Sequence, residues 1–117
     1  MSKKSISVIV TTYNRPNKLD NNIRLLLNQE LSNEIKFSII IVDDNSSVSN
    51  QNKVKSIANY SNLIKLIINP VNMGLSSSRN IGANQSKSDY LLFLDDDIMV
   101  DSFYVMGHLE VLMSGGR

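Results

Sequence analysis

Four short apolar runs, separated by segments of helical periodicity, limit the folds open to this sequence. The first two runs are nearly uninterrupted and rich in β-branched residues, which is typical of strands covered on both faces. The four predicted strands are residues 5–12, 37–42, 63–68 and 90–94. Helices are predicted at residues 16–31, around 54–58, at 75–84 and at 103–113. Strands that alternate with helices predict an α/β fold with a mostly parallel sheet of about four strands flanked by helices.

A polar cluster follows each of the four predicted strands. The clusters are residues 13–15, 43–44, 74–79 and 95–97. In open α/β sheets, ligands bind beyond the carboxyl ends of the strands, and parallel strands bring those ends to one edge. The four clusters are therefore expected to form one binding rim. Gly82, inside the third predicted helix, indicates close packing of that helix against the sheet.

The last cluster ends an apolar strand in three consecutive carboxylates. Side chains alternate along an extended chain, so Asp95 and Asp97 would point to one side and Asp96 to the other. Two like charges on one side favour a hard cation such as Mg²⁺ or Mn²⁺, which completes its shell with water and substrate phosphates. The alternative is a solvated acidic turn that ends the strand and caps the next helix.

Composition narrows the class of protein and its partners. A length of 117 residues with 42% hydrophobic content predicts one domain. The net charge of +1 provides no overall field that would attract nucleic acid, and no nucleic-acid partner is expected. The sequence has no cysteine, which excludes disulfides and fits a reducing compartment. No stretch is long enough to span a bilayer, so a cytoplasmic protein is expected, with peripheral attachment to a membrane left open.

Motifs at the four strand ends resemble those of a known family. They lie at residues 11–15 (TTYNR), 42–46 (VDDNS), 72–83 (NMGLSSSRNIGA) and 93–97 (FLDDD). In order and spacing they resemble the successive motifs of family 2 glycosyltransferases, the inverting enzymes with the GT-A fold. The resemblance covers almost the whole chain. It implies a Rossmann-like nucleotide-binding half and transfer of a hexose from a nucleotide-diphosphate donor to a saccharide, lipid-linked or other hydroxyl acceptor.

The resemblance also implies which residues bind the nucleotide. They are Thr11, Tyr13, Arg15, Asp43, Asp44, Arg79, Asp95 and Asp96. Thr11 and Tyr13 would surround the base, with the Tyr13 ring offering a face for stacking. Asp44, with Asp43 beside it, would accept a hydrogen bond from a ring N–H such as that of uracil, which favours a UDP-sugar. Arg79 would be a fixed cation near the base and the acidic rim.

The acidic triplet has two roles in the family that this sequence resembles. Asp95 or Asp96 would hold the ribose hydroxyls. Asp97 would ligate Mn²⁺ or Mg²⁺ directly, with Asp95 as a second candidate ligand. The metal would stabilise the leaving nucleoside diphosphate as a Lewis acid.

Several of these assignments have a structural alternative. Tyr13 has the position of a hydrophobic staple at the start of the first helix. Asp43 and Asp44 are suitable residues for capping the helix that follows them. Arg79 can equally be an ordinary arginine on the surface of a helix.

No catalytic residue is expected within this chain. In the family, the general base and the acceptor site belong to the second half of the domain, so residues 1–117 are expected to form a truncated donor-binding region. The isolated chain would bind donor without appreciable sugar transfer. His108 is expected to have a surface or packing role. A sheet that stops after its fourth strand exposes an edge, which favours self-association.

Other classes of α/β protein fit the sequence less well. A signalling receiver module needs an acidic pair after the first strand, whereas the acidic clusters here follow the second and fourth strands. A dinucleotide-binding half needs a Gly-x-Gly-x-x-Gly turn after the first strand, which this sequence lacks. A calcium loop starting at Asp95 would lack the central glycine and the final glutamate.

Overall fold

The computed structural model describes residues 4–95 and 104–113, which form alternating strands and helices. The strands are β1 (Lys4–Thr12), β2 (Ile35–Asp43), β3 (Ile64–Ile68) and β4 (Tyr90–Asp95). The helices are α1 (Pro16–Leu27), α2 (Val48–Ala58), α3 (Leu75–Asn84) and α4 (Tyr104–Met113). No helix in these described ranges is long and apolar enough to cross a membrane.

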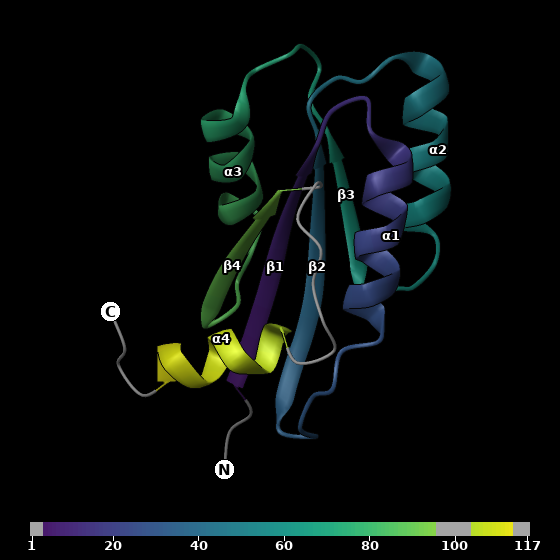
Figure 1. Ribbon diagram of the computed structural model, residues 1–117. Helices are drawn as coiled ribbons and strands as arrows, with labels where there is room; N and C mark the ends of the chain where they lie inside the picture. The colour runs from purple at the N-terminus through teal and green to yellow at the C-terminus, as the bar shows by residue number, and fades with distance from the viewer. Residues whose placement is uncertain (1–3, 96–103, 114–117) are drawn as a thin grey trace.

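The four strands form one sheet in the order β3-β2-β1-β4, and every pairing is parallel. Helices α1 and α2 cover one face and α3 covers the other, as Figure 1 shows. Because all four strands run the same way, their carboxyl ends lie together at the top of the view in Figure 1. The predicted α/β class with a mostly parallel sheet is confirmed. The strand ends lie at one edge, as expected for the predicted rim, and binding at that rim stays a prediction.

Alternation along β1 explains how both faces of the sheet are buried. Ile6, Val8 and Val10 are fully buried in the larger core, which also contains apolar residues of α1 and α2. Ile9 points the other way, into a smaller core that includes Ile81 of α3. This period of two is what a strand between two layers of helices requires.

Helix α1 ends at Leu27, so the predicted end near residue 31 was wrong. Gln29 accounts for part of the difference, because its side chain bonds to two separate segments. Its Nε2 donates to the Leu25 carbonyl at the end of α1 (3.1 Å), and its Oε1 accepts from the Val105 backbone N–H at the start of α4 (2.8 Å). Gln29 therefore closes one helix and connects it to another, a long-range role that helical periodicity does not reveal.

Gly82 brings α3 close to the sheet, as its place in the sequence predicted. A Cβ at this position would clash with the Ile9 side chain and lie 3.1 Å from Cγ2 of Val42. Both neighbours belong to the fully buried part of the sheet, so they have little room to move. Close contact between α3 and β1 therefore depends on the missing side chain.

Gly82→Ala is expected to destabilise the fold by about 1–3 kcal/mol, the usual cost of forcing extra volume into a packed core. Gly107→Ala is a matched control, because a Cβ there meets nothing within 4 Å on an exposed part of α4. The control should be neutral or stabilising by up to about 1 kcal/mol, the helix propensity difference. Urea unfolding measures both variants, and equal stability of the two would contradict the close approach of α3.

Candidate functional site

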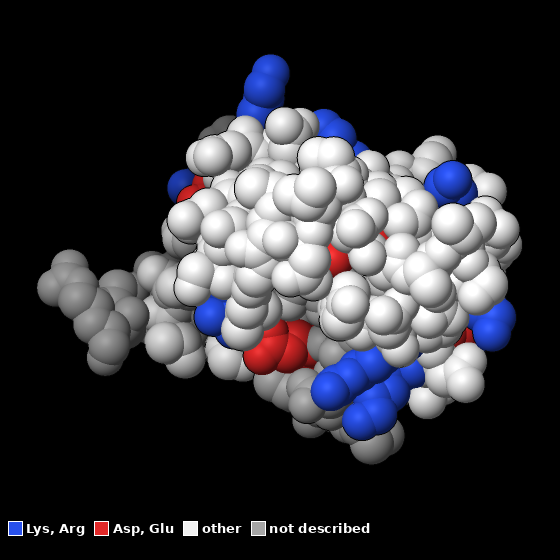
Figure 2. All heavy atoms as spheres, turned by 90° about the horizontal axis from the view of Figure 1, so that it is seen from above, with Lys and Arg blue, Asp and Glu red and all other residues white. Residues whose placement is uncertain are grey.

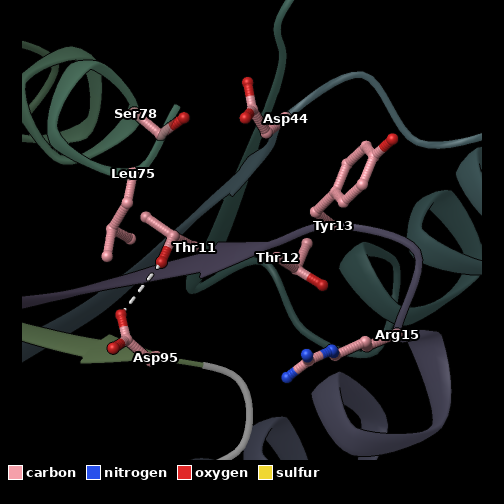
Figure 3. A pocket seen from close by; sticks show the side chains of 8 residues that line it. All are labelled: Thr11, Thr12, Tyr13, Arg15, Asp44, Leu75, Ser78 and Asp95. Atoms are coloured by element: carbon pink, nitrogen blue, oxygen red, sulfur yellow. Dashed lines mark hydrogen bonds between the residues drawn. The ribbon is translucent and has the colours of Figure 1, made fainter. Parts of the chain in front are cut away.

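A pocket of about 270 Å³ opens at the carboxyl ends of the strands. It is lined by Thr11, Thr12, Tyr13, Arg15, Asp44, Leu75, Ser78 and Asp95. These residues come from the ends of β1 and β4, from the loops after β1 and β2, and from the first turn of α3 (Figure 3). The structure thus brings residues from all four predicted clusters into one cavity.

Each side of the pocket combines a largely apolar side chain with a charged one. In Figure 3, Leu75 and Asp95 lie on one side, and Tyr13 and Arg15 on the other. The Tyr13 side chain is 48% exposed and Leu75 is 47% exposed, so both present apolar surface to a ligand. Thr11, between them, is buried and donates a hydrogen bond to Asp95 Oδ1 (3.3 Å).

Asp44 has the most heavily hydrogen-bonded carboxylate of the pocket lining. Its Oδ1 accepts from Asn69 Nδ2 (3.0 Å) and from the Met73 backbone N–H (2.7 Å), and its Oδ2 accepts from the Gly74 backbone N–H (3.0 Å). Burial raises the pKa of Asp44, but these bonds and one from Ser78 outweigh it and hold the pKa below its ordinary value. Asp44 is therefore ionised at neutral pH.

Asp43 is oriented away from the pocket lining. Its carboxylate is fully buried and accepts from the Ser46 backbone N–H (2.8 Å) and the Ser46 hydroxyl (2.6 Å). These bonds shape the turn before α2, which resembles the capping role considered as the alternative. A direct contact between Asp43 and a nucleotide stays a prediction.

Arg79 forms an ion pair with Asp95 instead of lying free on the helix surface. Its Nη2 lies 3.2 Å from Oδ1 and 3.4 Å from Oδ2 of Asp95. Arg79 does not line the pocket at the strand ends but lines a separate hollow with Ser76, Asn80 and Phe93. Its charge therefore acts on the pocket by neutralising and orienting Asp95.

The other two members of the acidic triplet, Asp96 and Asp97, lie outside the residues that the structure describes. Among the described residues, no three acidic or histidine side chains lie close enough to hold a metal ion. Figure 2, which looks onto the strand ends, shows acidic side chains beside a group of basic ones at one edge of this face. The metal assignments to Asp97 and Asp95 stay predictions.

His108 lies on α4, where its ring centroid is 4.7 Å from that of Tyr104. It is exposed, and it is not among the pocket-lining residues. This agrees with the surface or packing role expected for it.

Three pocket residues were given no role from the sequence. Leu75 and Ser78 both lie in the predicted third helix, and Thr12 ends β1. The polar cluster that begins at Gly74 could have identified Leu75 and Ser78 as pocket residues, because the first turn of a helix that follows a strand lies near the strand ends. A further residue, Asn69, is buried and bridges Asp44 and Ser78 with its side-chain amide (3.0 Å to each).

A parallel sheet covered by helices on both faces, with a polar pocket beyond its strand ends, defines the Rossmann-like α/β class. Within it, residues 7–112 match the family described as glycosyl transferase family 2, and the chain belongs to that family. An uncharacterized glycosyltransferase of Haemophilus influenzae is 42% identical over 92 residues, which cover 79% of this chain and 29% of the relative. The family resemblance of the four motifs is thereby confirmed.

Solved structures show the same fold. Staphylococcus aureus TarS in complex with UDP-GlcNAc matches with a TM-score of 0.78 and 24% identity, over 97% of this chain and 32% of TarS. A mannosyltransferase from Pyrobaculum calidifontis in complex with GDP-Man and Mn²⁺ matches with a TM-score of 0.83 and 16% identity, over 96% of this chain and 33% of that enzyme. The chain thus spans about a third of the length of each of these three proteins.

Asp44→Asn is expected to lower the stability at pH 7 by about 1–3 kcal/mol, because an amide nitrogen would replace an acceptor of buried N–H groups. The lowered pKa of Asp44 means that its ionised form stabilises the folded state. This contribution is complete above the unfolded-state pKa and is lost as the pH falls through the lower folded-state value.

Urea unfolding from pH 7 down to pH 3 tests this expectation. The difference between the unmodified chain and Asp44→Asn should shrink below about pH 4, the ordinary range for aspartate. Glu30→Gln, which changes an exposed carboxylate, is the control and should have little effect at any pH. A difference that is constant from pH 7 to pH 3 would show that ionised Asp44 is not stabilising.

Proposed function

We propose that this chain is the donor-binding part of an inverting glycosyltransferase that uses a nucleotide-diphosphate sugar, with a UDP-sugar favoured. The acceptor would be a saccharide or a lipid-linked hydroxyl. The observation that carries the proposal is the pocket, which is built from residues of all four motifs in a chain that belongs to family 2. The complexes of TarS with UDP-GlcNAc and of the mannosyltransferase with GDP-Man support a nucleotide-sugar as the ligand.

The nucleobase would lie beside Tyr13 and Leu75, whose exposed apolar surfaces flank the pocket. Aromatic rings stack favourably on planar bases. Asp44 would accept the ring N–H, but its oxygens already accept from Asn69, Met73, Gly74 and Ser78. A carboxylate has about four acceptor sites. The base would therefore replace the Ser78 hydroxyl, whose proton can rotate away, whereas Met73 and Gly74 donate from the backbone.

The ribose would lie near Asp95. Thr11 and Arg79 hold this carboxylate in place, so it can accept hydrogen bonds from ribose hydroxyls without a cost for ordering its side chain. Arg15 lines the same pocket from the opposite side. Its guanidinium suits the diphosphate, since its planar fork of N–H donors matches phosphate oxygens.

A divalent cation, Mn²⁺ or Mg²⁺, is proposed at the acidic triplet. The carboxylate oxygens of the triplet are suitable donors for a hard ion, and the Mn²⁺ in the mannosyltransferase complex supports this choice. Asp95 is paired with Arg79, which makes it less available to a cation and favours Asp97 as the ligand. When bound, the metal would stabilise charge on the leaving diphosphate.

The general base is proposed to lie outside residues 1–117. Among the described residues, the pocket is lined by two carboxylates, Asp44 and Asp95, which are held by fixed hydrogen bonds or an ion pair. A base must be free to take a proton from the acceptor hydroxyl within hydrogen-bond reach. Asp44 also has a lowered pKa, which makes it a weak base.

Uridine diphosphate should bind at least about tenfold more tightly than ADP, a difference of about 1.4 kcal/mol. The physical reason is that uracil presents a ring N–H to Asp44, whereas the Watson–Crick edge of adenine presents a ring nitrogen acceptor to the same carboxylate. Calorimetry with UDP, GDP and ADP in the presence of Mn²⁺ measures the ranking. Equal affinity for UDP and ADP would remove the case for uracil, and absence of binding by all three would overturn the proposed function.

Asp97→Asn should weaken Mn²⁺-dependent binding of UDP several-fold or more, because it removes a charged oxygen donor with little change in shape. Asp101→Asn, which changes a carboxylate in the same stretch of sequence, is the matched control. The measurement is UDP affinity with Mn²⁺ and with EDTA. If the metal dependence of Asp97→Asn matches that of the control, the ligand role moves to Asp95 or Asp96.

A further inference from the structure

Asn14 bends the chain between β1 and α1 in an unusual backbone conformation. Its φ of 52° lies in the left-handed region, where side chains other than glycine are strained. Asparagine tolerates this region better than most residues. Asn14 separates Tyr13 from Arg15, and both of these neighbours line the pocket while Asn14 does not.

Three hydrogen bonds connect Asn14 to the start of α2. Its backbone N–H donates to Ser46 Oγ (2.8 Å), and its Oδ1 accepts from the Ser47 backbone N–H (2.8 Å) and from Asn50 Nδ2 (3.0 Å). Ser47 is the N-cap of α2, so the Asn14 side chain satisfies an N–H group at the helix end. The bend after β1 is thus joined to the loop after β2.

The Ser46 hydroxyl links Asn14 to the buried carboxylate of Asp43. It donates its single proton to Asp43 Oδ1 (2.6 Å), so its oxygen is left to accept from Asn14. The Ser46 backbone N–H donates to the other Asp43 oxygen (2.8 Å). Because both Asp43 oxygens accept from Ser46, the donor and acceptor of each hydrogen bond in the series are fixed.

We propose that Asp43, Ser46 and Asn14 form a relay that positions Tyr13 and Arg15 for nucleotide binding. This inference rests on the proposed function. None of the three relay residues lines the pocket, so they are positioning residues that act through their neighbours. The relay orders the bend before the ligand arrives, which removes the entropic cost of ordering it on binding.

The test compares two asparagines that share one backbone conformation. Asn14→Gly keeps the left-handed bend but removes the carboxamide, and Asn14→Asp keeps an oxygen acceptor for the N–H groups of α2. Asn45→Gly is the matched control, because Asn45 is also left-handed (φ 64°) and exposed but is not part of the relay. The probe is UDP with Mn²⁺, measured by calorimetry, with urea unfolding in parallel.

Asn14→Gly should weaken UDP binding about tenfold, because binding must then order the freed bend. Asn14→Asp should restore most of the affinity, and Asn45→Gly should leave it within about twofold of the unmodified chain. The effect of Tyr13→Leu should be smaller in the Asn14→Gly background, which is the coupling expected if Asn14 acts through Tyr13. Equal affinities of Asn14→Gly and Asn45→Gly, or full additivity with Tyr13→Leu, would overturn the relay.

A second measurement separates this inference from the proposed function. Backbone ¹⁵N order parameters of Tyr13 and Arg15 report ordering of the bend without any ligand. They should fall in Asn14→Gly and stay unchanged in Asn45→Gly. If the unmodified chain binds no nucleotide, the proposed function fails, and the relay is still judged by these order parameters. Unchanged order parameters in Asn14→Gly would overturn the relay by themselves.

Discussion

The carboxylate of Asp44 fixes the geometry of the strand-end rim. It accepts backbone N–H groups of Met73 and Gly74, at the point where the chain turns into α3, and the side-chain amide of Asn69 just after β3. Buried N–H groups left without a partner are costly, so this single anion determines where α3 begins. Leu75 and Ser78, which line the pocket from the first turn of α3, take their positions from that start. Removal of the carboxylate would therefore disturb the binding surface and the packing of α3 together.

Asp43 and Asp44 are adjacent, yet they act on opposite sides of the sheet. Alternation along β2 sends Val42 into the core beneath α3, and Ile41 into the core beneath α1 and α2. Asp43 continues the second direction and is buried in the turn before α2, while Asp44 reaches the start of α3. Two identical side chains therefore organise the two loops that border the pocket, one on each face.

The sequence allowed the sheet, the helix order and the strand-end rim to be predicted, because these depend on local periodicity and on the common edge of parallel strands. Long-range hydrogen bonds could not be predicted from the sequence. The Gln29 contact just after the end of α1 and the Asn14 bend involve partners many residues away. The separate roles of Asp43 and Asp44 follow from the alternation of side chains along β2, which sends adjacent residues to opposite faces of the sheet. That alternation was the sequence feature that could have distinguished the two residues. Contacts of Asp96 and Asp97 lie outside the part of the chain that the structure describes.

The charges around the pocket indicate whether a bound diphosphate would be helped by a cation. Among its described lining residues, two carboxylates, Asp44 and Asp95, face one guanidinium, Arg15. Arg79 offsets Asp95 from outside the pocket, and the N–H donors around Asp44 stabilise its charge without cancelling it. The charges of these four described residues nearly cancel, and a nucleoside diphosphate would add several negative charges beside them. Like charges at close range in a partly desolvated pocket repel strongly, so additional positive charge would favour binding of such a ligand. A divalent cation beside the diphosphate would supply this charge, and nucleotide and metal binding would then depend on each other in the proposed site.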